Sequence, residues 1–393
     1  MLDSHVPATH DFSIITRVDD LINKAIKRNA SDIHLESTAY ELRVRYRIDG
    51  VLYDEQKIGK NVGLQIVSRI KILARINIAE RRIPQDGKFT SQGTLSPIDL
   101  RVSTFPSLHG EKVVIRILDR SEHTIELEKL GLQQAVFDTF KDLLQSSNGF
   151  FLTTGPTGSG KTTTLYAALT SLHSPEKNII TLEDPIEYNI EGITQGQIHP
   201  EAGFTFERGM RSLLRQDPDI AMVGEIRDKQ TARIAIEAAL TGHLVLSTLH
   251  TNNACSSIMR LMDMGIEPFL INASLTGVLA QRLVRKICVY CKEEVIPTDQ
   301  EALFLEKLSL SFKTIFRGSG CSHCFNLGYK GRTGIFELLV INNALRALII
   351  QSPQYEVLYQ KALDQGMQPL HSDAAQKLAD GTISLHEFIR VIV

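Results

Sequence analysis

The chain has 393 residues, of which 43% are hydrophobic and 22% charged, a composition typical of an ordinary globular protein of two or three domains. Its 43 basic and 45 acidic residues nearly balance, so bulk charge favours neither nucleic acid nor an anionic membrane surface as a partner. No apolar run approaches the roughly 18 residues of a membrane span, and the N-terminal stretch MLDSHVPATHDF lacks the apolar centre of a signal peptide.

The first 123 residues have the pattern of a small α+β domain. Apolar residues recur at helical spacing in residues 16–28 and again in residues 66–74. Between them, YELRVRYRIDGVLY alternates apolar residues with Arg43, Arg45 and Arg47, and Asp49-Gly50 is typical of a hairpin turn. Two further strand patterns, IDLRVSTF and KVVIRIL, end near residue 120. We expect an antiparallel sheet whose β-hairpin arginines form a solvated face.

The rest of the chain divides into four predicted parts. The polar stretch DRSEHTIELEKLG suggests a linker, assigned to residues 124–132. From 133 to 285, apolar strands alternate with helical segments, which predicts an α/β domain with a mainly parallel sheet. Residues 286–330 contain two cysteine pairs, and residues 331–393 are expected to be helical, with SLHE at Ser384–Glu387 fitting a capping box at the start of the last helix.

The strongest motif is a phosphate-binding loop between a predicted strand and a predicted helix. It matches the pattern G-x-x-x-x-G-K-[ST], in which glycines let backbone amides surround phosphates and the helix N-terminus adds its positive end. Lys161 is expected to reach the β- and γ-phosphates, and the Thr162 hydroxyl to bind magnesium. The expected nucleotide-binding residues are Gly155, Pro156, Thr157, Gly158, Ser159, Gly160, Lys161, Thr162 and Thr163.

Three further apolar runs end in polar residues. NIITLEDPIEY ends in Glu183 and Asp184, DIAMVGEIRD ends in Glu225, and HLVLSTLHTN ends in His250. A single acid at a strand end more often caps a helix or meets solvent, but ligands bind at the carboxyl ends of parallel strands, so three such ends favour a site. The strand before Glu225 lacks the Asp that commonly assists magnesium, so we expect Glu183 or Asp184 to replace it.

These residues leave their roles partly open. Glu225 is expected to polarise the attacking water and His250 to sense the γ-phosphate. The residue types alone do not decide which acid is the catalytic base.

Four cysteines form two C-x-x-C pairs, CVYC and CSHC, separated by residues 292–320. Four thiolates suit tetrahedral zinc, and a closed four-Cys site is structural rather than catalytic. The alternative is two redox-active pairs. Cys255 stands alone and is expected to be a small apolar filler. The predicted zinc ligands are Cys288, Cys291, Cys321 and Cys324.

Taken together, GPTGSGKTTTLY, TLEDPIEY, LLRQDPDIAMVGEIRD and TGHLVLSTLHTN resemble the Walker A, Asp-box, Walker B and His-box motifs of the secretion ATPase superfamily. SDIHLE, RIPQDGK, RVSTFPSLHGEKVVIRIL and AQRLVRKIC are also similar to this family, so the resemblance covers roughly residues 15–393. Members of the family carry Gly-Glu where a Walker B Asp is usual. The four cysteines make the chain more similar to the type II secretion and type IV pilus assembly branch than to the retraction branch.

The resemblance implies a RecA-like P-loop domain preceded by a PAS-like α+β domain. It also implies a cytoplasmic homohexamer, peripherally associated with the inner membrane, that hydrolyses ATP to drive assembly of pilin-like subunits. Its expected partners are inner-membrane platform and cytoplasmic-ring proteins, with ATP, Mg²⁺ and Zn²⁺ as ligands and no nucleic acid. ATP would lie between the two domains, and Arg101 and Arg116 match the family's phosphate-contacting pair. Relatives usually carry a further N-terminal docking domain, whereas the first predicted helix here begins at residue 16, which leaves membrane recruitment open.

Two other functions are compatible with parts of this pattern. A RecA-like nucleic-acid motor would share the strand-end acids, although the balanced charge and the lack of interleaved basic and aromatic residues do not favour it. A nucleotide-sensing scaffold held by zinc would not need the intact Lys161, Thr162 and acids. The helically spaced arginines Arg208, Arg211 and Arg215 could face solvent, pair with acids or contact a neighbouring subunit.

Overall fold

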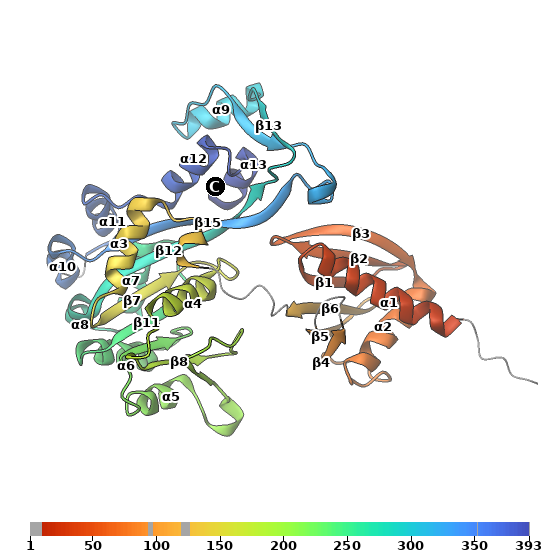
Figure 1. Ribbon diagram of the computed structural model, residues 1–393, viewed down its shortest axis with the longest axis horizontal. Helices are drawn as coiled ribbons and strands as arrows, with labels where there is room; N and C mark the ends of the chain where they lie inside the picture. Colours follow the sequence, from red (N-terminus) through yellow and green to blue (C-terminus); the bar gives the residue numbers. More distant parts are fainter. Residues whose placement is uncertain (1–9, 93–96, 119–125, 352, 393) are drawn as a thin grey trace, which may run out of the picture. The chain divides into compact units, whose positions relative to one another are not determined.

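The computed structural model describes residues 10–92, 97–118, 126–351 and 353–392. The chain forms two compact units, residues 1–122 and residues 123–393, each with its own sheet (Figure 1).

The first unit is a six-stranded sheet with two helices on one face. The strands follow the spatial order β3-β2-β1-β6-β5-β4, and every neighbouring pair is antiparallel. Its elements are α1 (His10–Lys27), β1 (Ala30–Ser37), β2 (Glu41–Ile48), β3 (Val51–Gly59), α2 (Lys60–Leu73), β4 (Gln85–Gln92), β5 (Pro97–Ser107) and β6 (Gly110–Leu118). The first helix therefore begins earlier than the periodicity of residues 16–28 predicts.

Strand β2 connects the sequence pattern to the core of this unit. Burial alternates along the strand, so Val44 and Tyr46 lie in the core, which α1 and α2 cover (Figure 1). The Tyr46 hydroxyl donates a 2.8 Å hydrogen bond to the Leu21 carbonyl of α1. Asp49 and Gly50 have φ of 49° and 84°, the left-handed conformation that the tight turn between β2 and β3 requires. The predicted alternation and hairpin are confirmed.

The outward-facing arginines of β2 are bound to acids rather than simply solvated, which corrects the prediction for this face. Each pairs with a carboxylate on a neighbouring strand: Asp32 is the register partner of Arg47, whereas Asp54 and Glu36 lie diagonally from Arg43 and Arg45. The pairs are Arg43–Asp54 at 2.8 Å, Arg45–Glu36 at 2.6 Å and Arg47–Asp32 at 3.6 Å.

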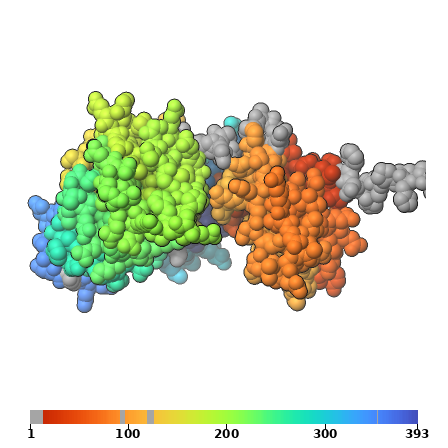
Figure 2. All heavy atoms as spheres, turned by 90° about the horizontal axis from the view of Figure 1, so that it is seen from below, coloured from red at the N-terminus to blue at the C-terminus, as the bar shows by residue number. Residues whose placement is uncertain are grey.

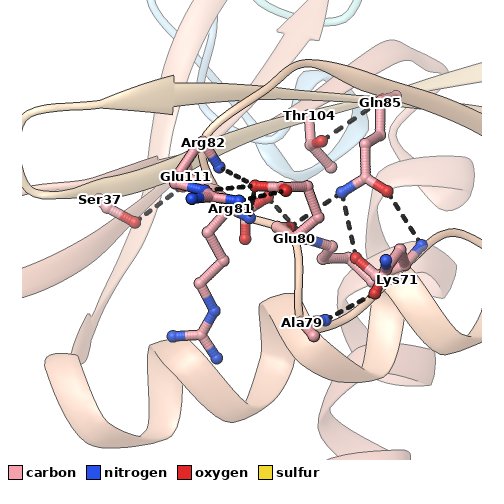
Figure 3. Close-up of polar contacts among 10 residues, drawn as sticks. Ser37, Lys71, Ala79, Glu80, Arg81, Arg82, Gln85, Thr104 and Glu111 are labelled. Carbon is pink, nitrogen blue, oxygen red and sulfur yellow. Dashed lines mark hydrogen bonds and ion pairs between the residues drawn. The ribbon is translucent and has the colours of Figure 1, made fainter.

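A buried lysine organises the loop between α2 and β4. Lys71 is 1% exposed and donates hydrogen bonds of 2.7 Å to the Glu111 carboxylate and 2.6 Å to the Glu80 carbonyl. Figure 3 shows that Gln85 reaches the same loop, and its amide donates to the Glu80 carbonyl at 3.0 Å. The Glu80 carboxylate in turn accepts from the backbone amide of Arg82. In Figure 2, seen from below, most of the visible face of the first unit is orange, the colour range that includes α2 and β4.

The second unit is built on a seven-stranded sheet in the order β15-β12-β7-β11-β10-β8-β9. Every pairing is parallel except that of β12 with β15. Its elements up to residue 263 are η1 (Leu127–Leu130), α3 (Gln134–Leu144), β7 (Gly149–Thr154), α4 (Lys161–Leu172), β8 (Ile179–Glu183), β9 (Thr194–Gln197), η2 (Pro200–Ala202), α5 (Phe206–Leu213), β10 (Ile220–Val223), α6 (Lys229–Leu240), β11 (Leu244–Leu249) and α7 (Ala254–Asp263).

The elements after residue 263 complete this sheet and add a small subdomain. They are α8 (Pro268–Ser274), β12 (Leu275–Ile287), β13 (Lys292–Val295), α9 (Asp299–Lys307), β14 (Ile315–Gly318), η3 (Ser322–Cys324), β15 (Tyr329–Val340), α10 (Asn343–Ile350), α11 (Tyr355–Asp364), α12 (Leu370–Ala379) and α13 (Leu385–Ile392). Strands β13 and β14 form a separate antiparallel pair, and with α9 they fill the gap between the two cysteine pairs.

Helices cover both faces of the large sheet, so its central strands are buried on both sides. Along β7, Phe150 and Leu152 pack into the core that contains residues of α6, α7 and α8, whereas Phe151 packs with α3 and α4. This is the continuous burial expected of parallel strands, and it confirms the predicted α/β architecture.

Two parts of the second unit differ from the sequence predictions. Residues Tyr329–Val340 form an edge strand of the large sheet, so the prediction of a helical chain from residue 331 is wrong for β15. A short apolar run does not distinguish a buried strand from a buried helix. Leu127 and Leu130, in the predicted linker, are buried in the core beside α4. Residues 119–125 of that stretch lie outside the described residues.

The last helix is joined to the sheet by a buried ion pair. The Ser384 hydroxyl accepts a 3.2 Å hydrogen bond from the Glu387 amide, which is one half of the predicted capping box. The Glu387 carboxylate instead binds Arg285 of β12, at 2.5 Å, and Arg390. No helix in the described ranges combines the length and apolarity that crossing a bilayer requires.

Replacing Lys71 with methionine should destabilise the first unit, because Glu111 would keep a buried carboxylate without its cation. Removing one partner of such a pair typically costs about 3–5 kcal/mol. Hydrogen exchange measured on the full chain should therefore accelerate strongly for the amides of β5 and β6 and stay unchanged for β7. Arg82→Met is the matched control, because its ion pair with Glu80 is exposed and contributes little. Equal exchange in both variants would contradict the prediction.

Candidate active site

The carboxyl ends of four parallel strands meet at one edge of the large sheet. β7 pairs with β11, β11 with β10, and β10 with β8, in registers that set these ends side by side. β7 leads into the phosphate loop, β8 ends at Glu183, β10 leads to Glu225, and β11 leads to His250. The strand ends that the sequence analysis selected are therefore neighbours in the fold.

The phosphate loop joins β7 to α4 and depends on glycine at its tightest points. Gly155, Gly158 and Gly160 have φ of 149°, 77° and 87°. A Cβ atom on Gly155 would lie 2.3 Å from the carbonyl oxygen of Gln281, so only glycine fits there. Gln281 also donates a 2.8 Å hydrogen bond from its side chain to the Ser159 carbonyl, which fixes the loop from β12.

Residues 156–158 at the tip of the loop are exposed, whereas Ser159 is buried. Thr162 is exposed and Thr163 half-buried in the first turn of α4, directly after the loop. The amides of this turn have no earlier helical carbonyl to bind, so the helix end suits an anion.

Lys161 is the buried cation of the loop. Its ammonium donates hydrogen bonds of 2.9 Å to the Gly155 carbonyl and 3.1 Å to the Pro156 carbonyl, and it lies 3.5 Å from Nδ1 of His250. Burial lowers the pKa of Lys161, and the negative charge of Glu225 opposes this effect. The loop thus holds a positive charge that is supported by a carboxylate following a different strand, that of Glu225.

His250 connects this cation to Glu225. Its Nε2 lies 3.6 Å from Oε2 of Glu225, whose other oxygen binds the Arg227 guanidinium. Burial and the Lys161 ammonium lower the pKa of His250, whereas Glu225 raises it. A neutral imidazole can accept from Lys161 at Nδ1 and present its Nε2 proton to Glu225. Lys161, His250 and Glu225 therefore form a continuous polar chain.

The absence of an aspartate before Glu225 has a packing explanation. A Cβ atom on Gly224 would lie 3.2 Å from the Leu182 carbonyl oxygen and 3.5 Å from the Cα atom of Glu183. The Gly224 amide donates a 2.8 Å hydrogen bond to that same carbonyl. Strand β8 approaches so closely that its backbone would have to give by a few tenths of an ångström to admit a side chain here. The first carboxylate after β10 is that of Glu225.

Glu183 and Asp184 occupy contrasting environments although they are adjacent. Glu183 is 2% exposed, and its carboxylate accepts hydrogen bonds from the hydroxyls of Tyr166 and Thr181 and, at 3.1 Å, from the Gln195 amide. Burial and the Glu183 carboxylate raise the pKa of Tyr166, which keeps the phenol protonated as a donor. Asp184 is exposed and close enough to Arg227 to raise the pKa of that guanidinium, after the larger effect of Glu225.

Arg101 and Arg116 belong to the first unit. They are directly opposite each other on β5 and β6, both are exposed, and the Nε of Arg116 lies 3.1 Å from the Asp32 carboxylate. Their assignment as phosphate contacts stays a prediction. On α5, Arg211 pairs with Glu207 at 3.2 Å and Arg208 binds a backbone carbonyl, and Arg215, just after the helix, also binds a backbone carbonyl.

Sequence reasoning missed three groups at this edge. Arg227 binds Glu225 from two residues away, a spacing that could have suggested the pair. Thr154, the last residue of β7, accepts a 3.0 Å hydrogen bond from the Thr251 amide, and Gln281 holds the phosphate loop. No local pattern pointed to the last two contacts, because they arise from the pairing of β7 with β11 and β12.

The four cysteines form one compact cluster. All four Sγ atoms lie within 4.8 Å of one another, with 3.8 Å between Cys288 and Cys321, 3.8 Å between Cys291 and Cys324, and 3.7 Å between Cys321 and Cys324. Zinc–sulfur bonds of about 2.3 Å in a tetrahedron place neighbouring sulfurs about 3.8 Å apart. The cluster is therefore compatible with zinc. Cys255 is buried in the core, as expected of an apolar filler.

Comparisons with known proteins agree with this architecture. A family described as "Type II/IV secretion system protein" matches residues 8–390. The chain is 46% identical over 381 residues to the type II secretion system ATPase E of Vibrio cholerae serotype O1, covering 97% of this chain and 76% of that protein. It is 45% identical over 374 residues to the type IV pilus assembly ATPase PilB of Thermus thermophilus, covering 95% of this chain and 42% of that protein.

Solved structures give the same answer for the fold. A crystal structure of the pilus retraction motor PilT with bound ADP matches with a TM-score of 0.62 and 27% identity, covering 95% of this chain and 96% of that one. The Legionella pneumophila ATPase DotB matches with a TM-score of 0.69 and 21% identity, covering 100% and 98% of the two chains. The predicted similarity to the secretion and pilus-assembly branch is confirmed.

Removing one cysteine of the cluster should release a bound metal and loosen the surrounding segment. We expect one zinc per chain in freshly purified, reduced protein. Cys324→Ser should lose most of its zinc, because three thiolates bind the ion more weakly than four. Amide exchange should accelerate in residues 288–324 of this variant. Cys255→Ser is the matched control and should keep its zinc. Reduced wild-type protein without zinc by metal analysis would contradict the prediction.

Proposed function

From the premise that this chain belongs to the family of type II/IV secretion system proteins and is an ATPase, we propose that it hydrolyses ATP at the edge of the large sheet. The hydrolysis would power assembly of pilin-like subunits for type II protein secretion or type IV pilus biogenesis. The observation that carries the site assignment is the convergence of Lys161, His250 and Glu225 from three separate strand ends. A buried cation beside a phosphate-loop backbone and an adjacent carboxylate is the arrangement that phosphoryl transfer to water requires.

The phosphate loop binds the nucleotide in this proposal. The backbone of residues 155–163 surrounds the phosphates, and the Lys161 ammonium exchanges its two loop carbonyls for β- and γ-phosphate oxygens. Thr162 would hold magnesium through its hydroxyl, and exposed Asp184 is better placed than buried Glu183 to act on the water shell of the ion. Magnesium supplies neutralising charge to the phosphates when bound.

Glu225 is the proposed base that polarises the attacking water. Its side chain is 18% exposed and faces His250, so it can reach a water near the phosphate. Glu183 is a weaker candidate because it is only 2% exposed and its carboxylate is enclosed by the donors Tyr166, Thr181 and Gln195, which leaves little room for a water. His250 lies between Lys161 and Glu225, so a change in its position or hydrogen bonding when the γ-phosphate is present would affect both groups.

The remaining parts of the proposal concern assembly. The four cysteines would hold a structural zinc, because a closed thiolate site leaves no position for substrate. The protein would act as a cytoplasmic homohexamer beside the inner membrane, with membrane-platform and cytoplasmic-ring proteins of the machine as partners. A nucleic-acid motor would instead be stimulated by its substrate, so ATPase assays with and without single-stranded DNA discriminate the two functions: stimulation by DNA would overturn the proposal.

Glu225→Gln should retain ATP binding and lose most turnover, because the amide keeps the shape of the side chain and removes its basicity. We expect at least a hundredfold loss in kcat, on the order of what a positioned base contributes, measured as steady-state phosphate release with a fluorescent nucleotide reporting affinity. Glu183→Gln is the matched control and should lose less. Lys161→Ala should be inactive through lost phosphate contact. If Glu183→Gln were the inactive variant and Glu225→Gln active, the base would lie on β8.

Arg101 and Arg116 should be needed for turnover although neither belongs to the unit that carries the phosphate loop. In the proposal they neutralise phosphate charge and help couple hydrolysis to movement of rigid units. Arg101→Ala and Arg116→Ala should each lower kcat at least roughly tenfold, well below the largest effects known for arginines that stabilise phosphoryl-transfer charge. Arg43→Ala, on the same sheet but paired with Asp54, should leave turnover nearly unchanged. Wild-type activity in the double variant Arg101→Ala/Arg116→Ala would discard this role.

A further inference from the structure

The segment that carries His250 is fastened from three directions. It runs from His250 to Asn253, between β11 and α7, without regular secondary structure. On one side, Thr251 is bound to Thr154: its amide donates at 3.0 Å and the two hydroxyls are 2.7 Å apart. At its end, the Asn253 side-chain oxygen accepts a 2.9 Å hydrogen bond from the Ser256 amide and so caps α7.

The third attachment comes from the C-terminal helices. The Asn253 side-chain nitrogen donates a 2.7 Å hydrogen bond to the hydroxyl of Tyr355, the first residue of α11. α11 packs against α7 (Figure 1), and Tyr355 stacks on Tyr359 one turn later, with ring centroids 5.6 Å apart. Both polar atoms of the Asn253 side chain are therefore engaged, the oxygen with α7 and the nitrogen with α11.

A second residue of the C-terminal part supports the same point. Glu337 of β15 is 2% exposed and accepts a 2.8 Å hydrogen bond from the Ala254 amide, next to Asn253. Its other oxygen accepts from the Leu370 amide at the start of α12. The end of the His250 segment is therefore held by groups that follow it by 83 and 102 positions.

We propose that Tyr355 is a positioning residue for hydrolysis: its hydroxyl holds Asn253, which fixes the path of the chain back to His250, and so places the imidazole between Lys161 and Glu225. This inference rests on the proposed role of His250 in turnover. It gives α11 an indirect part in the active-site geometry, exerted through Asn253. Because the segment is short, a displacement of Asn253 changes the position of His250 more readily than that of the phosphate loop, which Gln281 holds from β12.

Tyr355→Phe removes one oxygen atom and keeps the ring stack, so it tests the contact without removing the packing. We expect kcat for ATP hydrolysis to fall roughly three- to tenfold, the effect of losing one ordinary hydrogen bond that stabilises the conformation with His250 between Lys161 and Glu225. The affinity for a fluorescent ADP analogue should stay within about twofold, because the phosphate loop keeps its own attachments. Tyr359→Phe, at the stacked neighbour, is the matched control and should be as active as wild type.

Variants of Asn253 separate the cap from the tether. Asn253→Ser keeps a cap for α7 but is too short to reach Tyr355, so it should match Tyr355→Phe, and combining the two should add little. Asn253→Asp offers one oxygen to Ser256 and one to the Tyr355 hydroxyl, so it should preserve most activity. If Asn253 served only as the N-cap of α7, Asn253→Ser would be as active as wild type. That result would overturn the proposal.

His250→Ala distinguishes failure of this inference from failure of the site assignment. If His250→Ala is impaired and adding Tyr355→Phe lowers kcat no further, Tyr355 acts through His250 as proposed. If His250→Ala is impaired and Tyr355→Phe has wild-type kcat, the positioning role is wrong and the site assignment stands. Full activity of His250→Ala would instead overturn the role given to His250, and the inference with it. Amide exchange in α7 and α11 should match wild type in Tyr355→Phe; a general loss of protection would attribute the effect to unfolding and overturn the proposal.

Discussion

The parallel pairing of β7 with β11, and of β11 with β10, is the constraint on which the second unit depends. Parallel strands place their carboxyl ends at one edge, and ligands bind at that edge because the loops leaving it are free to carry polar groups. Every residue of these three strands is buried, so the pairing is held between helices on both faces of the sheet. The phosphate loop, Glu225 and His250 become neighbours through this pairing, although they are far apart in the sequence.

The same packing sets the electrostatics of the edge. Lys161 is buried beside two carbonyls, and burial opposes its charge while Glu225 supports it. His250 lies between the two, with a lowered pKa that favours the neutral imidazole. A nucleotide's phosphates would place negative charge beside this buried cation and so offset the effect of its burial.

Buried polar contacts connect the later parts of the chain to this sheet. Arg285 of β12 is 4% exposed and binds Glu387 of α13, and Glu337 of β15 receives the amides that open α7 and α12. Each of these carboxylates would be costly to bury without its partners, so these contacts specify how the C-terminal helices dock. The C-terminal region is consequently part of the framework of the large sheet, and Tyr355 reaches the His250 segment from within it.

Local sequence determined much of the fold and most of the candidate site. The alternation in β2, the Asp49-Gly50 turn, the glycines of the phosphate loop and the spacing of the four cysteines each carry their own conformational or chemical preference, so they could be predicted without neighbours. Only the tertiary structure decided that Glu183 is enclosed by hydrogen bonds while Glu225 faces His250, because adjacent acids at strand ends look alike until the packing around each is known. It also decided that β15 joins the sheet and that Gln281 and Tyr355 reach the site. Those contacts join residues about a hundred positions apart, and they exist because strand pairing and helix docking, rather than any local pattern, bring the residues together.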